Sequence, residues 1–459
     1  MLSPVLSHVD DTLPAALERL FKLLSIPSIS TDPAFAARCD DAADALVADL
    51  SSLGLAASKR LTPGHPMVVA HSDGPGPHLL LYGHYDVQPV DPLALWDNDP
   101  FIPQLEETPF GEVIRARGAS DDKGQLMTFV EAARAWIAVH GALPCKVTFL
   151  FEGEEESGSP SLVPFLEENT DELRADLALI CDTGLFADKV PAIVTRLRGL
   201  LGQEIIITGP SKDLHSGMYG GPARNPARVL ARVLADLHDA NGAVTVPGFY
   251  DGVPDLPHDI AEQWESLGFD HESFLGEVGL SVPAGEEGKS ALEQIWSRPT
   301  CEINGMKSGY TGEGFKTVLP SQASAKISFR LVGKQDPIAI RHAFQAFIRA
   351  RLPADCEVEF RDHGAGPASE MNTAHPLFEQ ARHTLSEEWG VPAIYAGCGG
   401  SIPIAGHFQD ILGLDSMLVG FAKDSDQIHS PNEKYDLSSF RKGIRSWVRL
   451  LASIAETNA

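Results

Sequence analysis

The sequence predicts an α/β protein in which two separate parts of the chain form one domain and a smaller α+β domain is inserted between them. Three observations predict it. Short apolar runs alternate with helical patterns over residues 1–198 and again over 367–459, which indicates a sheet with helical crossovers. Residues 199–366 follow a different order of strands and helices, typical of a compact α+β layer. A chain of 459 residues is also long enough for two or three domains.

In the first part of the chain, the spacing of apolar residues changes from helical to strand-like. Recurrence every three or four residues predicts helices over about 12–24 and 34–53, and a third helix over about 124–139. Short apolar runs predict four strands, at 67–70, 78–82, 146–151 and 176–181.

The inserted part begins with an alternating strand and ends in a short linker. The predicted strands and helices, in chain order, are 200–208, 225–239, 323–331, 337–350 and 357–362. A loop-rich segment with many Pro, Gly and Glu residues runs from about 240 to 302, and residues 364–367 are the predicted linker.

In the last part of the chain the α/β pattern returns. A helix is predicted over about 375–389 and a long one over 437–455, with apolar stretches at 393–395 and 416–421.

Composition and charge exclude several classes of partner. The chain carries 36 basic and 63 acidic residues, a net charge of −27, which argues against nucleic acid and anionic membrane surfaces as partners. The six cysteines are scattered without a Cys-x-x-Cys pair, which favours a reducing compartment. Residues 1–11 do not have the pattern of a secretory signal, and no apolar run is long enough to span a bilayer. We therefore expect a cytoplasmic protein.

The first candidate site residue is His84, at the end of a predicted buried strand. Asp86 follows two residues later, and its carboxylate can hold the imidazole in the tautomer that binds a metal. A His-x-Asp pair by itself is more often a hydrogen-bonded histidine beside a loop aspartate. The metal interpretation therefore depends on further ligands elsewhere in the chain.

Four other stretches place metal-binding side chains next to strand ends, where open α/β sheets bind ligands. Each stretch has a structural alternative: Asp121 or Asp122 could cap the following helix, and Asp182 could serve a turn. The run from Glu152 to Glu156 could be a solvated surface, but four carboxylates at the end of a buried strand repel one another, and a divalent cation would offset that repulsion. His429 alone could be a structural histidine.

Together these stretches supply two imidazoles and three carboxylates. The candidate metal ligands are His84, Asp121, Glu156, Asp182 and His429. This donor set suits two divalent cations, Zn²⁺ first, with Mn²⁺ or Co²⁺ as alternatives. Two cations joined by a shared carboxylate can generate a nucleophilic water near neutral pH.

These motifs, in this order, resemble the M20 family of metallopeptidases, and most of all its dipeptidase branch of cytosolic nonspecific dipeptidases and carnosinases. The resemblance covers nearly the whole chain. It implies a mixed-sheet α/β/α dinuclear metallohydrolase domain from residues 1–198 and 367–459, with 199–366 as an inserted α+β lid and dimerisation domain. It also implies that His84 and Asp182 hold one metal and Glu156 and His429 the other, with Asp121 bridging.

The same resemblance assigns the proton chemistry. Asp86 would orient His84, and Glu155 would be the general base that takes a proton from the metal-activated water and delivers it to the leaving amine. Glu154 is a departure from the family pattern, and its carboxylate would either lie beside the metals or point to solvent.

Further candidates lie in the inserted segment and in a later glycine-rich loop. By the resemblance, His215 from the partner subunit stabilises the oxyanion and Thr317 also acts across the dimer, while Arg330, Gly400 and Ser401 bind the substrate's C-terminal carboxylate. The structural alternatives are a loop histidine, a loop hydroxyl, a strand-end ion pair for Arg330 and a turn for the glycines.

The sequence therefore predicts a homodimeric dinuclear metallo-dipeptidase that cleaves short peptides with a free C-terminal carboxylate. The alternative enzyme is an N-acyl, N-succinyl or N-carbamoyl amino acid amidohydrolase with the same metal site. The amino acids at positions 84–89 and 399–403 resemble those of the dipeptidase branch, which favours the dipeptidase. The Glu155–Glu156 pair argues against a non-catalytic binding protein, which needs no proton shuttle.

Overall fold

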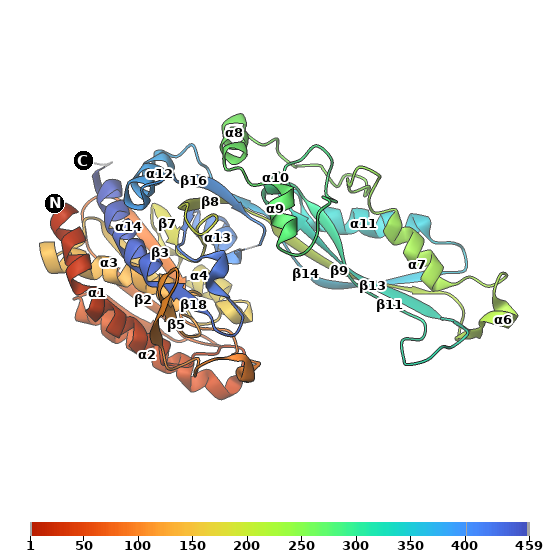
Figure 1. Ribbon diagram of the computed structural model, residues 1–459, viewed down its shortest axis with the longest axis horizontal. Coiled ribbons are helices and arrows are strands. Elements are labelled where there is room, and N and C mark those ends of the chain that lie inside the picture. The colour runs from red at the N-terminus through yellow and green to blue at the C-terminus, as the bar shows by residue number, and fades with distance from the viewer. Residues whose placement is uncertain (1, 401, 457–459) are drawn as a thin grey trace. The chain divides into compact units, whose positions relative to one another are not determined.

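The computed structural model describes residues 2–400 and 402–456. The chain forms two compact units. Unit 1 comprises Met1–Thr195, Met371–Ala396 and His407–Ala459, and unit 2 comprises Arg196–Glu370 and Gly397–Gly406. Figure 1 shows the elements of both.

Unit 1 is built on a mixed sheet, which confirms the predicted α/β class. The strand order is β1-β2-β6-β3-β7-β17-β8, with β16 also pairing β8. β6, β3, β7 and β17 run parallel to one another, whereas β1, β2 and β8 pair antiparallel with their neighbours. The strands are β1 (Ala56–Arg60), β2 (Met67–Ser72), β3 (His78–His84), β6 (Lys146–Glu152), β7 (Leu177–Ile180), β8 (Ala192–Leu197), β16 (Ile394–Cys398) and β17 (Ser416–Val419).

The helices of unit 1 bury their apolar faces against this sheet and against one another. α3 packs between β3, α1 and α14, and nearly all of its first three turns are buried. The helices are α1 (Leu2–Leu24), α2 (Ala36–Ser52), α3 (Lys123–His140), α4 (Leu162–Glu168), α5 (Thr170–Leu173), α12 (Pro376–Trp389) and α14 (Leu437–Glu456). A small separate sheet has the order β18-β5-β4, formed by β4 (Gln104–Thr108), β5 (Gly111–Arg115) and β18 (Lys434–Asp436).

Unit 2 is a four-stranded antiparallel sheet with helices packed on it. The strand order is β11-β13-β9-β14, and the core joins these strands to α7 and α11. The strands are β9 (Gly199–Thr208), β11 (Thr300–Ser308), β13 (Gln322–Leu331) and β14 (Glu357–Gly366). A two-stranded pair and several helices complete the unit: β10 (Leu214–His215), β12 (Val318–Leu319), α6 (Ser216–Tyr219), α7 (Pro226–Ala235), α8 (His258–Ser266), α9 (His271–Gly276), α10 (Ala291–Trp296) and α11 (Pro337–Arg351).

Some predicted element bounds were wrong. α1 begins at Leu2 rather than near residue 12, because Val5, Leu6 and Val9 extend its buried face. The segment predicted as loop-rich contains α8, α9 and α10, three helices of 9, 6 and 6 residues that are too short to show a clear helical repeat. The predicted linker at 364–367 lies largely in β14, which runs to Gly366 past a bulge.

Candidate active site

The candidate site lies where three neighbouring parallel strands of unit 1 end. β3 ends on His84, β6 ends on Glu152 just before a 3₁₀ turn at Glu155–Ser157, and Asp182 follows β7. Since β6, β3 and β7 are adjacent and parallel, their carboxyl ends meet at one edge of the sheet. This topology brings together side chains that are up to 98 residues apart.

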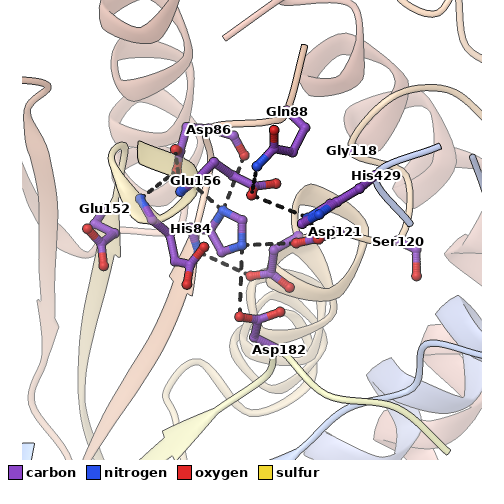
Figure 2. Close-up of polar contacts among 12 residues, drawn as sticks. His84, Asp86, Gln88, Gly118, Ser120, Asp121, Glu152, Glu156, Asp182 and His429 are labelled. Carbon is purple, nitrogen blue, oxygen red and sulfur yellow. Dashed lines mark hydrogen bonds and ion pairs between the residues drawn. The ribbon is translucent and has the colours of Figure 1, made fainter. Parts of the chain in front are cut away.

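The first group of potential metal ligands contains His84, Asp121 and Asp182. The Nε2 atom of His84 is 3.1 Å from Asp121 Oδ1 and 3.9 Å from Asp182 Oδ2. The ligand atoms of all three residues lie within 4.8 Å of one another. Figure 2 shows the His84 ring between Asp86, Asp121 and Asp182.

The second group contains Asp121, Glu156 and His429. The Nε2 atom of His429 is 2.9 Å from Asp121 Oδ2 and 3.3 Å from Glu156 Oε2, and the ligand atoms again lie within 4.8 Å. The two oxygens of Asp121 therefore face two different histidines. The structure brings all five predicted ligands together in two groups that share Asp121.

The charge of this cluster is unbalanced without a cation. Burial raises the pKa of Asp182 well above its usual value. Hydrogen bonds to Asp121 and Glu156 raise the pKa of His429 to about 10. Burial opposes the charged form of His84, but its hydrogen bonds with Asp121 and Asp86 outweigh burial and raise its pKa. The carboxylates thus draw positive charge onto the imidazoles, and divalent cations would supply that charge instead.

Asp86 is fully buried and links His84 to the turn that carries Glu155 and Glu156. Its carboxylate lies 3.3 Å from His84 Nδ1 and accepts hydrogen bonds from the backbone N–H groups of Glu155 (3.3 Å) and Glu156 (3.0 Å). One side chain therefore fixes the orientation of the imidazole and the backbone of the glutamate turn.

The helix-cap interpretation of the Asp121–Asp122 pair is wrong. Asp122 occupies the N-cap position of α3 but makes no side-chain cap hydrogen bond there. Its Oδ2 instead accepts from the backbone N–H of His84 at 3.1 Å, and its Oδ1 is buried without a hydrogen-bond partner in the described chain. Burial raises its pKa well above the usual value.

Neither expectation for Glu154 describes its contacts. This side chain is 3% exposed, so it does not point to solvent. Its carboxylate accepts from the backbone N–H groups of His65 (2.9 Å) and Ser161 (3.0 Å). Glu154 therefore joins two loops. Glu155, one residue later, is half-buried, and burial raises its pKa.

Sequence reasoning missed the role of Glu433, which holds the loop that carries Asp121. This fully buried carboxylate accepts from the backbone N–H groups of Gly118, Ser120 and Asp121 at 2.9–3.0 Å, and from Arg117 Nη1 at 2.7 Å. Glu433 stands four residues after His429, in a stretch that the sequence had singled out, but its partners lie more than 300 residues away along the chain. No signal in the sequence pairs it with them.

The predicted residues of unit 2 fall in two places. His215 pairs with Val318 across β10 and β12, and Ser216 N–H donates to the Thr317 carbonyl at 3.1 Å, so His215 and Thr317 are neighbours. Both side chains are exposed. The histidine also caps α6, since its Nδ1 accepts from Gly217 N–H at 3.0 Å.

Arg330 and Gly400 lie elsewhere in unit 2. Arg330 is half-buried on β13 and forms no ion pair within the described chain, so the predicted structural alternative of a strand-end ion pair is not observed. The Gly400 carbonyl accepts from Arg198 N–H at 3.2 Å. Ser401 lies outside the described residues.

Two further predictions concern the whole chain. No disulfide joins any of the six cysteines, all of which lie in the described part of the chain, and five of them are buried. Among the described residues, none of the helices combines the length and the apolarity needed to cross a bilayer.

A mixed α/β sheet that gathers two imidazoles and three carboxylates at one edge is typical of metal-dependent hydrolases. Comparison with known proteins identifies the class further. Residues 80–453 match the profile of peptidase family M20/M25/M40. The chain belongs to this family, and the protein is a peptidase.

Individual relatives resemble the chain over most of its length. It is 29% identical over 467 residues to the Cys-Gly metallodipeptidase DUG1 of Candida albicans, covering 97% of this chain and 96% of that protein. It is 27% identical over 403 residues to the human Beta-Ala-His dipeptidase, covering 86% of this chain and 78% of that protein. Among solved structures, the chain matches Sso-CP2, an M20 family metallo-carboxypeptidase from Sulfolobus solfataricus, with a TM-score of 0.81 at 31% identity. The match covers 96% of this chain and 99% of that one.

Proposed function

We propose that the protein is a dinuclear metal-dependent dipeptidase that hydrolyses short peptides with a free C-terminal carboxylate. The observation that carries the proposal is the placement of Asp121, whose two oxygens face two histidine-containing groups. A carboxylate in this position suits a bridge between two cations.

The donor atoms fit two divalent cations. His84, Asp121 and Asp182 would hold one, and Asp121, Glu156 and His429 the other. Oε1 of Glu156 is buried without a hydrogen-bond partner in the described chain, as expected for an atom reserved for a metal. Imidazole and carboxylate ligands favour Zn²⁺, with Mn²⁺ and Co²⁺ as alternatives. When bound, such cations lower the pKa of a water molecule and polarise the scissile carbonyl.

Glu155 is the proposed general base. Its carboxylate would take a proton from the attacking water and deliver it to the amine of the leaving amino acid. Burial raises the pKa of this carboxyl, which makes the protonated form accessible during the cycle. Asp86 would keep the Glu155 backbone and the His84 ring in place through the contacts described above.

Residues 199–366 would form the lid and the dimer contact. Arg330 lacks an ionic partner in the described chain, which supports a role in binding the substrate carboxylate together with Gly400 and Ser401. His215 and Thr317 would act at the active site of the partner subunit. Large apolar side chains close to them in sequence are exposed, which supports a protein interface at this end of unit 2: Met218 (75%), Tyr219 (47%) and Phe315 (91%).

The relatives support the choice of substrate. The names of the two dipeptidases describe Cys-Gly and β-Ala-His, and the structural relative is called a carboxypeptidase. Each of these substrates ends in a free carboxylate. The six cysteines of the described chain form no disulfide, which supports a reducing location, and we propose the cytoplasm.

A substrate panel tests the proposal. Apo-protein is reconstituted with Zn²⁺, Mn²⁺ or Co²⁺ in turn and assayed with dipeptides, the matching dipeptide amides, and N-acetyl amino acids. We expect hydrolysis of dipeptides and little of their C-terminal amides. Preferential hydrolysis of N-acetyl amino acids, or cation binding without hydrolysis of any amide, would overturn the proposal.

A further inference from the structure

Gln88 makes a direct contact with a candidate metal ligand. Its Nε2 donates to Glu156 Oε2 at 2.6 Å, and that same oxygen is 3.3 Å from His429 Nε2 (Figure 2). The Glu156 side chain is only 4% exposed. One oxygen of this carboxylate is therefore held by an amide, while the other, Oε1, is buried without a hydrogen-bond partner in the described chain.

The backbone on both sides of Gln88 is anchored. Val87 N–H donates to the Ser28 carbonyl at 3.0 Å. The Pro89 carbonyl accepts from Arg117 Nη2, also at 3.0 Å, and Arg117 is 1% exposed. The amide of Gln88 thus extends from a fixed point of the chain, which reduces the entropy lost in holding Glu156.

Asp86 and Gln88, two residues apart, both contact the turn that carries Glu155 and Glu156. His84 lies opposite Glu152 in the β3–β6 register, and the Asp86 carboxylate accepts from the backbone of Glu155 and Glu156. Gln88 then contacts the Glu156 side chain. A period of two is that of an extended chain, so residues 84, 86 and 88 share one side. On this side, Asp86 contacts both the His84 imidazole and the turn backbone, and Gln88 contacts the side chain of Glu156.

We propose that Gln88 is a positioning residue that fixes Glu156 and so raises the cation affinity of the Asp121–Glu156–His429 group. The inference rests on the proposed function. An amide is suited to this task because it donates a hydrogen bond without charge. A lysine or arginine would neutralise Glu156, whereas the amide leaves the full carboxylate charge to the cation.

Cation titration of the Gln88→Met variant tests this role. Methionine has a similar length but no donor. Calorimetric titration of apo-protein with Zn²⁺, and separately with Mn²⁺, should show one of two binding steps weakened about 10- to 100-fold, as is typical for loss of a partner of a metal ligand. Anomalous diffraction at sub-saturating cation should locate the loss at the Glu156–His429 group. Gln409→Met removes an exposed amide in the same unit and should change neither step.

The outcomes separate this inference from the proposed function. The role of Gln88 alone would be overturned if the wild type binds cations in two steps and Gln88→Met has the same two dissociation constants. It would also be overturned if the variant weakens both steps equally. A wild-type protein that binds no divalent cation would overturn the proposed function and this inference with it. If Gln88→Met melts at a lower temperature without metal, Gln88→Asn is titrated instead. Its amide is one methylene too short to reach Glu156, so the same selective loss is expected.

Discussion

At the scale of single residues, Glu155 and Glu156 show how adjacent side chains can serve different tasks. Both backbone N–H groups bind Asp86, but the side chain of Glu156 faces His429 and Gln88. In the proposed mechanism, the turn presents the Glu156 carboxylate as a metal ligand and leaves the Glu155 carboxylate for proton transfer.

Replacing Glu155 by Gln should abolish most of the turnover without removing the cations. The amide keeps the size of the side chain but cannot accept a proton, so kcat on dipeptides should fall about 10²- to 10⁴-fold. Steady-state kinetics and cation titration together check this. Glu167→Gln, on an exposed face of α4, is the matched control and should leave kcat unchanged. Full turnover in Glu155→Gln would contradict the proposed mechanism.

Glu433 should matter for stability as well as for the site. It is the acceptor for three backbone N–H groups and Arg117, and all of these groups are buried except that of Asp121, which is partly buried. Glu433→Gln would place an NH₂ group against these donors and leave Arg117 without its charge partner. We expect a loss of about 3–5 kcal/mol in the free energy of unfolding of the apo-protein, measured in urea.

The control for Glu433 is an exposed ion pair. Glu359→Gln breaks the contact with Arg361, in which both side chains are more than half exposed, and should cost about 0–1 kcal/mol. Similar losses for the two variants would show that the Arg117–Glu433 pair does not hold the Asp121 loop.

At the scale of elements, periodicity predicted best where a strand or helix has one clear apolar pattern. β3 and β6 are continuous buried runs, and α11 has a regular apolar stripe, so their positions were found from the sequence. β4 and β5 carry exposed polar residues beside few apolar ones, and no pattern distinguished them from loops.

The site was predictable to the extent that its ligands follow buried strands. The strand-end rule located His84, Glu156 and Asp182. It could not find Gln88 or Glu433, because these residues act through hydrogen bonds between segments 68 and more than 300 residues apart. Such contacts depend on side-chain direction in the folded chain, which spacing alone does not determine.

The end of α3 offers a test of element geometry away from the site. Gly141 closes this helix with φ = 79°, and its N–H donates to the Ile137 carbonyl. A Cβ there would meet no atom within 4 Å, so only the backbone conformation penalises a side chain. Gly141→Ala should lower the free energy of unfolding by about 1–2 kcal/mol. Gly141→Asn should lower the free energy of unfolding by less, because asparagine adopts this conformation more readily than alanine. Equal losses in urea unfolding would contradict this reasoning.

At the scale of the whole molecule, cation binding should stabilise the fold. The candidate ligands come from positions 84 to 429, so they assemble only in the folded chain. At a free cation concentration 100 times the dissociation constant, one site adds about 2.7 kcal/mol to the free energy of unfolding. Chelation should therefore lower the melting temperature of the wild type, and added Zn²⁺ or Mn²⁺ should restore it. The variant Asp121→Asn weakens the shared ligand, so its melting temperature should be nearly the same with and without chelator.

The last prediction tests the proposed dimer, because an active site that two subunits share could be reassembled from two defective chains. Glu155→Gln and His215→Ala should each be inactive as purified. In a mixed dimer, the subunit that keeps Glu155 receives His215 from its partner, so one of the two sites is complete. After exchange of subunits at equal concentrations, random pairing should restore about a quarter of the wild-type activity.

A second mixture controls for mere subunit exchange. Glu155→Gln and Glu156→Ala both alter unit 1, so each subunit of their mixed dimer carries its own defect and no site is complete. This mixture should stay inactive. Activity that returns only in the first mixture requires that His215 serve the other chain. Failure of the first mixture, with subunit exchange verified by native mass spectrometry, would place His215 in its own subunit's site or outside catalysis.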